Sequence, residues 1–136
     1  MADRIIIFDT SIFIDHLRIN KYAKHIQDVN GIIRNSSVVL AELARGATRE
    51  PEENFVAALA RNHPIVTPTE RNWLESGAIL SNMYKDRGFD PEKLRDLHFD
   101  VLIALTARNY GAIVITSNRT DFELIRSYKT FQLEVW

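Results

Sequence analysis

The chain has 136 residues, of which 46% are hydrophobic and 26% are charged, and it contains no cysteine. This length and composition are typical of one globular domain and exclude a disordered chain, a collagen-like repeat and a coiled coil. Seventeen basic and eighteen acidic residues give a formal net charge of −1, which argues against a protein that wraps a polyanion. Without cysteine, neither disulfides nor thiolate metal sites can form, and a reducing compartment is favoured.

The apolar stretches are shorter than the ~18 residues that would indicate a membrane span, and the N-terminal one is too short for a signal peptide. We therefore expect a cytoplasmic protein without a membrane partner. The first apolar run, Ile5 to Phe8, does not alternate with polar residues, which predicts a parallel strand covered on both faces. Residues 31–35 and 65–66 indicate weaker strands, and acidic residues at positions 50–53 open a helix.

Further along the chain, Thr67 is predicted to cap a long helix, because a proline follows it and a glutamate stands three residues later. This helix is expected to stop at Gly88. A short turn or helix then begins at Asp90-Pro91, and another helix runs from about residue 97 to 108. Residues 112–116 predict a second buried strand, and residues 131–135 an edge strand. The alternation of strands and helices predicts a single three-layer α/β/α sandwich over residues 1–136, with a mostly parallel central sheet.

Three acidic residues stand alone in apolar surroundings. Asp9 directly follows the first strand, Glu42 is the only charge in residues 37–44, and Asp100 is the only charge in residues 99–107. Burying an ionised carboxylate costs several kcal/mol unless it is paired, hydrogen-bonded or bound to a metal. A helix cap or an ion pair would explain one such acid equally well, but three in a small domain indicate a shared site.

The predicted strands place two acidic segments at one edge of the sheet. Asp9 follows the first strand, and residues 116–121, which end in Asp121, follow the strand at 112–116. Ligands of open parallel sheets bind beyond the carboxyl ends of the strands. Carboxylates that converge there repel one another unless a cation holds them, and oxygen ligands favour Mg²⁺ or Mn²⁺. Such a site suits hydrolysis of phosphate esters, in which the metal activates a water molecule.

Four pieces of the sequence together match a known family, and they lie in residues 6–11, 37–46, 100–112 and 116–122. They are Ile6-Ile7-Phe8-Asp9-Thr10-Ser11, Ser37-Val38-Val39-Leu40-Ala41-Glu42-Leu43-Ala44-Arg45-Gly46, Asp100-Val101-Leu102-Ile103-Ala104 with Gly111-Ala112, and Thr116-Ser117-Asn118-Arg119-Thr120-Asp121-Phe122. In this order and spacing, the chain resembles the PIN-domain ribonucleases and, within them, the VapC-type toxins of toxin–antitoxin pairs. Each piece is weak alone, but the set is specific and spans nearly the whole chain.

The resemblance implies a PIN-like fold and a Mg²⁺-dependent endoribonuclease, in which Mn²⁺ can substitute. Its catalytic acids would be Asp9, Glu42, Asp100 and Asp121. Asp9 and Asp100 would be the firmest metal ligands, and Glu42 and Asp121 are further candidates. The family often has an acid where Asn118 stands, so we expect a hydrogen-bonding role for this amide. The resemblance also implies an RNA substrate, a VapB-like antitoxin as partner, and a homodimer.

Other polar side chains are candidates for supporting roles in the same site. The hydroxyls of Thr10, Ser11 and Thr116 can orient the carboxylates or contact phosphate. Arg119 would either neutralise an RNA phosphate or cap the strand end. An apolar surface, formed by residues 19–26 and by the helix after Pro68, would serve as an antitoxin groove or as a dimer face.

Two other functions remain open at this point. A haloacid-dehalogenase-like phosphatase would use Asp9 as a covalent nucleophile, and residues 114–118 resemble the second motif of that family. However, Ser11 stands where that family normally has an aspartate, and few residues follow Thr116 to supply its later motifs. The second alternative is a non-catalytic module that binds a partner protein. If four acids hold a metal, fourteen acids face seventeen basic residues, so the remaining surface is mildly basic.

Overall fold

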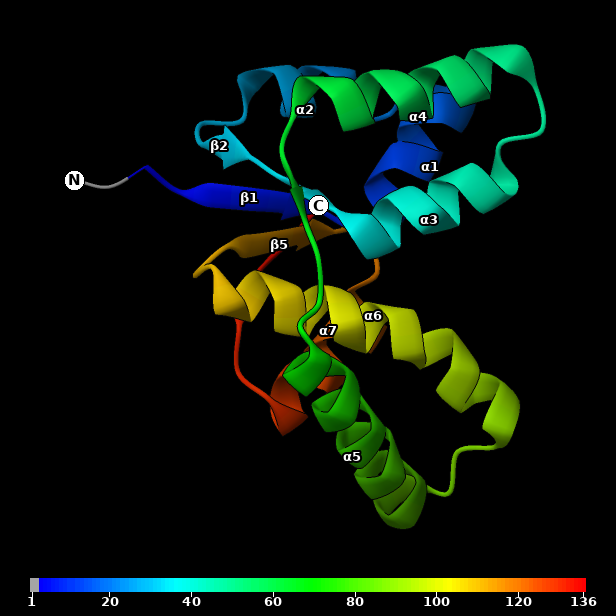
Figure 1. Ribbon diagram of the computed structural model, residues 1–136, viewed down its shortest axis with the longest axis vertical. Helices are drawn as coiled ribbons and strands as arrows, with labels where there is room; N and C mark the ends of the chain where they lie inside the picture. Colours follow the sequence, from blue (N-terminus) through cyan, green and yellow to red (C-terminus); the bar gives the residue numbers. More distant parts are fainter. Residues whose placement is uncertain (1–2) are drawn as a thin grey trace.

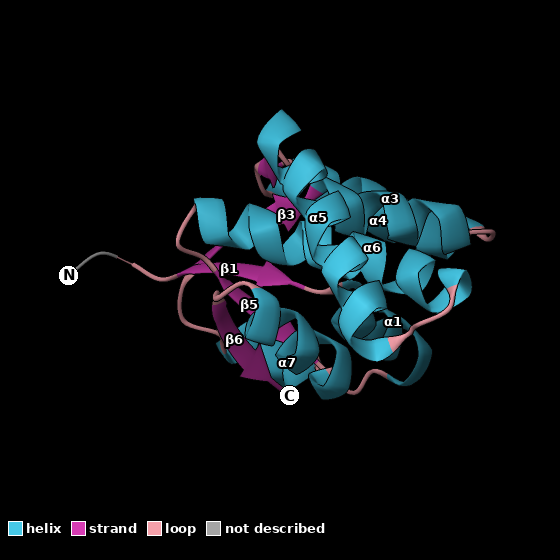
Figure 2. Ribbon diagram, turned by 90° about the horizontal axis from the view of Figure 1, so that it is seen from below, coloured by secondary structure: helices cyan, strands magenta, loops and turns pink. Residues whose placement is uncertain are grey.

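A four-stranded parallel sheet forms the centre of the computed structural model, which describes residues 3–136 (Figure 1). The strands are β1 (Ile5–Phe8), β2 (Ile32–Ile33), β5 (Ile113–Thr116) and β6 (Gln132–Val135), in the order β2-β1-β5-β6. Figure 2 shows β1, β5 and β6 side by side. Because β1 and β5 are parallel neighbours, with Phe8 opposite Ile115, both end at the same edge of the sheet. The edge position of β6 confirms the prediction for residues 131–135.

The weak strand predicted at residues 31–35 is divided between two sheets. β2 ends at Ile33, whereas β3 (Asn35–Ser36) pairs in parallel with β4 (Ile65–Val66) in a second, two-stranded sheet. The backbone N–H of Arg34 donates to Ile6 in the central sheet, and the N–H of Asn35 donates to Pro64. Arg34 and Asn35, which are neighbours in the chain, thus bond to different segments. The long-range pairing of strands therefore decides where the predicted strand is divided.

Helices cover both faces of the central sheet, which confirms the predicted three-layer α/β/α architecture. In Figure 1, the first four helices lie on one side of β1 and β5, and the last three lie on the other. Their bounds are α1 (Thr10–Ile19), α2 (Ala23–Asp28), α3 (Ser37–Gly46), α4 (Glu50–Asn62), α5 (Glu70–Arg87), α6 (Pro91–Asn109) and α7 (Arg119–Tyr128). No helix within residues 3–136 is both long and apolar enough to cross a membrane.

Two helix boundaries differ from the prediction. α5 is capped by Thr69 instead of Thr67, because the Thr69 hydroxyl accepts from the N–H of Asn72 while the Asn72 side chain accepts from the N–H of Thr69. α5 does stop at Gly88, which has φ of 66° in the left-handed region. The separate segments predicted after Asp90 are one continuous helix, α6, in which Pro91 occupies the first helical position.

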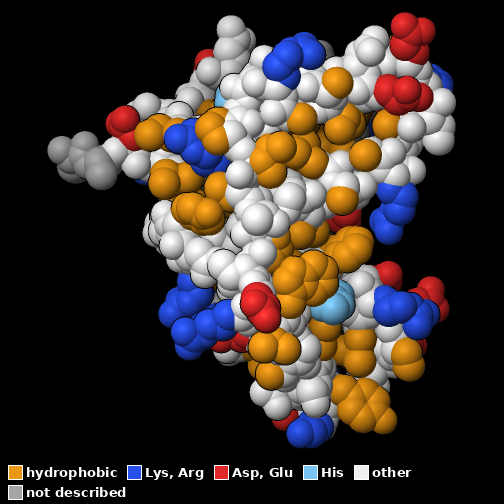
Figure 3. All heavy atoms as spheres, in the orientation of Figure 1, with side chains coloured by type: hydrophobic (Ala, Val, Ile, Leu, Met, Phe, Trp, Pro, Cys, Tyr) orange, Lys and Arg blue, Asp and Glu red, His pale blue; other side chains and the backbone are white. Residues whose placement is uncertain are grey.

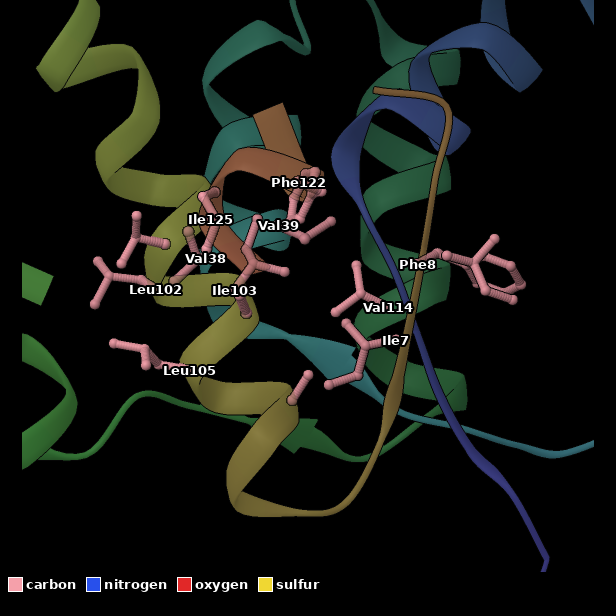
Figure 4. Packing of buried hydrophobic residues seen from close by; sticks show 14 of the residues in the cluster. Ile7, Phe8, Val38, Val39, Leu102, Ile103, Leu105, Val114, Phe122 and Ile125 are labelled. Carbon is pink, nitrogen blue, oxygen red and sulfur yellow. The ribbon is translucent and has the colours of Figure 1, made fainter. Parts of the chain in front are cut away.

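The hydrophobic core lies between the sheet and its helices. Ile7 and Val114 of the strands are completely buried, as is Ile103 of α6. Figure 4 shows Ile103 lying against these strand residues. Burial of the strands on both faces explains why their sequences lack alternation. α6 therefore runs through the core, and a carboxylate in its middle is carried into an apolar environment.

Candidate active site

Asp9 is fixed at the carboxyl end of β1 by a set of hydroxyl groups. Its backbone N–H donates to Ile115 of the neighbouring strand, and its side chain is nearly buried, with 3% of the residue exposed. The Ser11 and Thr116 hydroxyls donate to Asp9 Oδ2 over 2.7 and 2.8 Å, and the Ser11 N–H donates to the same atom at 3.4 Å. Asp9 also caps α1. Oδ2 is thereby held in place by three donors.

Glu42 is brought to the same edge by α3. The Ser36 hydroxyl caps this helix by accepting from the N–H groups of Val38 and Val39. Glu42 then lies one and a half turns into the helix, where the Thr10 hydroxyl donates to its Oε1 at 2.7 Å. Burial raises the pKa of Glu42, and the charge of Asp9 raises it further, against the lowering effect of the Thr10 hydrogen bond.

Asp100 is the acid most affected by its neighbours. It lies in the middle of α6, and its pKa is raised to about 9, first by burial and then by the charges of Asp9, Glu42 and Asp121. Lys93 opposes this shift. The pKa of Asp9 is raised as well, by burial, although its hydrogen bonds act in the opposite direction. The structure thus brings the other three acids singled out in the sequence within electrostatic reach of Asp100.

Asp121 has a different environment in the first turn of α7. The Asn118 side chain caps this helix by accepting from the N–H of Asp121, and its amide donates to Asp121 Oδ2 at 3.0 Å. The Lys93 ammonium donates to Asp121 Oδ1, also at 3.0 Å. Lys93 did not stand out in the sequence. The available signal is its spacing, because Lys93 stands seven residues before Asp100 and both lie on α6. Two helical turns return a side chain to the same face, so this spacing indicates that Lys93 lies on the face that carries Asp100.

Arg119 lies away from the four acids, whereas Ser117 supports the site. The Arg119 guanidinium pairs with Glu123 along α7, with 66% of its side chain exposed, and it does not contact the four acids. Ser117, which the sequence reasoning left out, donates its N–H to Ser11 Oγ and its hydroxyl to Asp15 Oδ2. Ser117 therefore supports the hydroxyl that holds Asp9, a role that depends on the contact between α1 and the end of β5.

The donor set of this site fits Mg²⁺ in kind, since it consists of carboxylate and hydroxyl oxygens. Burial and mutual repulsion make ionisation of Asp9 and Asp100 costly, and a divalent ion would offset this cost. Asp100 accepts no hydrogen bond from the described part of the chain, so both of its oxygens are available. Within residues 3–136, no three acidic or histidine side chains lie close enough together, as placed, to hold a metal ion. Binding would therefore draw the carboxylates inward.

The sequence matches the family described as PIN domain over residues 6–127. The chain belongs to the PIN domain family. This is the family that its four motifs resemble, and not that of the haloacid-dehalogenase-like phosphatases. No curated protein matches the chain.

Solved structures share the fold of this PIN domain at low sequence identity. A chain in the structure of VapBC2 from Rickettsia felis, bound to a promoter DNA fragment, is 22% identical with a TM-score of 0.71, covering 97% of this chain and 98% of that one. A chain of DNA-bound VapBC from Salmonella typhimurium is 20% identical with a TM-score of 0.67, covering 100% and 99%. A chain of a toxin–antitoxin complex from Klebsiella pneumoniae is 21% identical with a TM-score of 0.61, covering 86% and 89%.

A largely apolar hollow of about 110 Å³ opens beside Glu42, one of the four acids of this PIN domain. It lies between α1, α3 and α4, and Glu42 is part of its wall. The other residues that line it are Ile14, Leu17, Arg18, Leu43, Gly46, Ala47, Glu52 and Val56. On the opposite helix layer, Figure 3 shows hydrophobic side chains exposed over α5, and the large ones most exposed there are Trp73, Leu74 and Tyr84. Of the apolar surface expected from sequence, the part on α5 is exposed. Residues 19–26 do not line the hollow: Ile19 is exposed, whereas Tyr22 is buried and Ile26 packs against the core.

Proposed function

We propose that this PIN domain is a Mg²⁺-dependent endoribonuclease and the toxin of a toxin–antitoxin pair. The observation that carries the proposal is the grouping of four acids: Asp100, on the core helix α6, lies within electrostatic reach of Asp9, Glu42 and Asp121. Such a cluster is costly for the fold and is explained by a divalent ion that the acids bind together. Membership of the PIN family and the fold shared with VapBC complexes support the nuclease and toxin roles.

Mg²⁺, when bound, supplies a Lewis acid that lowers the pKa of water and offsets the charge of the attacked phosphate. We assign its binding to Asp9 and Asp100. The hydroxyls of Ser11 and Thr116 orient Asp9 by donating to its Oδ2. Glu42 is held through Oε1 by Thr10, and its raised pKa suits a group that takes a proton from water at Oε2.

The hollow beside Glu42 supports an antitoxin as the protein partner. An apolar segment of a VapB-like antitoxin that fills this hollow would lie directly against Glu42. It would therefore block access of RNA to the site. The exposed apolar residues of α5 lie on the other helix layer, and we assign them to a homodimer interface.

Cleavage of RNA by the purified protein tests the proposed activity. A structured RNA is incubated with the protein and Mg²⁺, with and without EDTA, beside the variants Asp9→Asn and Asp100→Asn. Asp96→Asn is the matched control, because Asp96 lies on the same helix as Asp100 but is exposed. We expect cleavage by the wild type and by the Asp96 variant, which EDTA abolishes, and none by the other two.

The proposal fails if inhibitor-free wild type leaves RNA intact in Mg²⁺, or if the Asp9 and Asp100 variants cut equally well. The toxin role has a separate test in cells. Expression of the wild type alone should arrest growth, expression of the Asp9 and Asp100 variants should not, and the protein that co-purifies with the chain should relieve the arrest.

A further inference from the structure

Both oxygens of the Asp121 carboxylate are engaged by groups of this chain. Oδ1 accepts from the Lys93 ammonium, and Oδ2 accepts from the Asn118 amide, each at 3.0 Å. Only 20% of the Asp121 side chain is exposed. Asp100, by contrast, accepts no hydrogen bond from residues 3–136. Asp121 is thus the acid of the cluster whose charge is already balanced by a side-chain cation.

The position of Lys93 shows that this pairing is specific. Lys93 is the third residue of α6, and its backbone N–H is fixed by the capping side chain of Asp90 at 2.9 Å. The positive end of the helix dipole disfavours a cation in the first turn. Pairing with a partly buried carboxylate offsets this cost, since such a pair is screened less by water and salt than a fully exposed one.

The same ammonium also acts on the rest of the cluster. Among the charges that shift the pKa of Asp100, those of Asp9, Glu42 and Asp121 raise it, and that of Lys93 lowers it. Lys93 and Asp100 share a face of α6, two turns apart, so a rigid helix fixes their separation at ~10 Å along its axis. Lys93 is therefore a permanent positive charge at one end of the acidic cluster.

We propose that Lys93 takes the place of a second metal ion in this site. Its ammonium neutralises Asp121, so that the cluster binds a single divalent ion on the side of Asp9 and Asp100. This inference rests on the proposed function, in which the acids bind Mg²⁺. Lys93 is a positioning residue: it acts by holding Asp121 away from the metal.

Calorimetric titration with Mn²⁺, without RNA, tests this role. Wild type is expected to bind one ion per chain, and Lys93→Gln two, because Asp121 becomes available as a ligand. The matched control is Lys129→Gln. Lys129 forms an ion pair of the same length, 3.0 Å, with Glu75, and 34% of its side chain is exposed, against 39% for Lys93. This control should bind one ion with wild-type affinity, and thermal unfolding in EDTA should show that both variants fold.

A double variant identifies the ligand of the second ion. Lys93→Gln combined with Asp121→Asn should bind one ion again, because the released carboxylate is absent. The inference is overturned if Lys93→Gln binds a single ion with wild-type affinity, or if the double variant still binds two. These results are independent of the RNA assay. If RNA is not cleaved but Lys93→Gln binds two Mn²⁺ ions where wild type binds one, only the nuclease proposal is rejected. If RNA is cleaved normally but Lys93→Gln binds one ion with wild-type affinity, only the role of Lys93 is rejected.

Discussion

The two ends of the acidic cluster are built in opposite ways. At the Asp9 end, neutral hydroxyls from α1 and β5 hold one carboxylate oxygen, and burial is nearly complete. At the Asp121 end, a lysine and an amide engage both oxygens, and a fifth of the side chain is exposed. Hydroxyls orient a carboxylate but leave its charge in place, whereas the lysine cancels it.

The different partners of Asp9 and Asp121 indicate two different roles for acids that look alike in the sequence. An oriented and uncompensated carboxylate is suited to bind an external cation, and a compensated one is suited to hold structure together. The cluster is therefore asymmetric: Asp121 is paired with a side-chain cation, and Asp9 and Asp100 are not. Substitutions at the two ends should have very unequal effects.

The largest expected effect is the difference in the rate of RNA cleavage between the variants Asp9→Asn and Asp121→Asn. Loss of the Asp9 charge removes a metal ligand, so the rate of RNA cleavage should fall by about a thousandfold, the scale of losing a central catalytic interaction. The Asp121 variant should lose about tenfold, the lower end of the range for residues that act on a metal site indirectly. Single-turnover cleavage rates of the two variants measure this contrast. Equal losses would show that both acids are metal ligands.

The next effect concerns the stability of the metal-free protein. The pKa of Asp100 is about 9 in the folded protein, against an ordinary value of 3.8. Between these pH values the folded state keeps a proton that the unfolded state has released, so stability falls as pH rises from about 4 to about 9. Asp100→Asn removes this dependence, and in EDTA it should melt several degrees above wild type at pH 8, while at pH 4 the two should coincide.

Thermal unfolding in EDTA across this pH range measures the effect, with Asp96→Asn as the exposed control on the same helix. A lower melting temperature for the Asp100 variant at pH 8 would contradict the account. Such a result would mean that a partner within the folded chain stabilises the Asp100 charge.

An effect on cleavage smaller than that of Asp9→Asn is expected from Thr116→Val, which removes one hydroxyl from Asp9. Loss of a group that orients a metal ligand typically costs ~10–100-fold in activity or metal affinity, so cleavage should fall within that range. Thr106→Val is the control, because Thr106 is equally buried but its hydroxyl bonds only to the Leu102 carbonyl within α6. If both variants lose activity equally, the Asp9 hydrogen bond has no special role.

Three of the acids are recognisable in the sequence because a single charge stands out in an apolar stretch that is expected to be buried. Asp9, Glu42 and Asp100 each interrupt a run whose burial follows from composition alone. Lys93 could not be recognised in the same way, because a lysine among polar residues is ordinary. Its contact with Asp121 depends on how α6 packs against α7. Sequence also could not reveal that residues 31–35 serve two sheets, since the two sets of partners are distant in the chain.

Crystals soaked with Mn²⁺ and measured for its anomalous scattering test the central claim most directly. We expect one Mn²⁺ peak, at coordination distance (about 2.0–2.5 Å) from oxygens of both Asp9 and Asp100, with Asp121 still paired to Lys93. The absence of a peak at saturating Mn²⁺, or a peak bound by Asp121 with Asp9 and Asp100 uncoordinated, would contradict it.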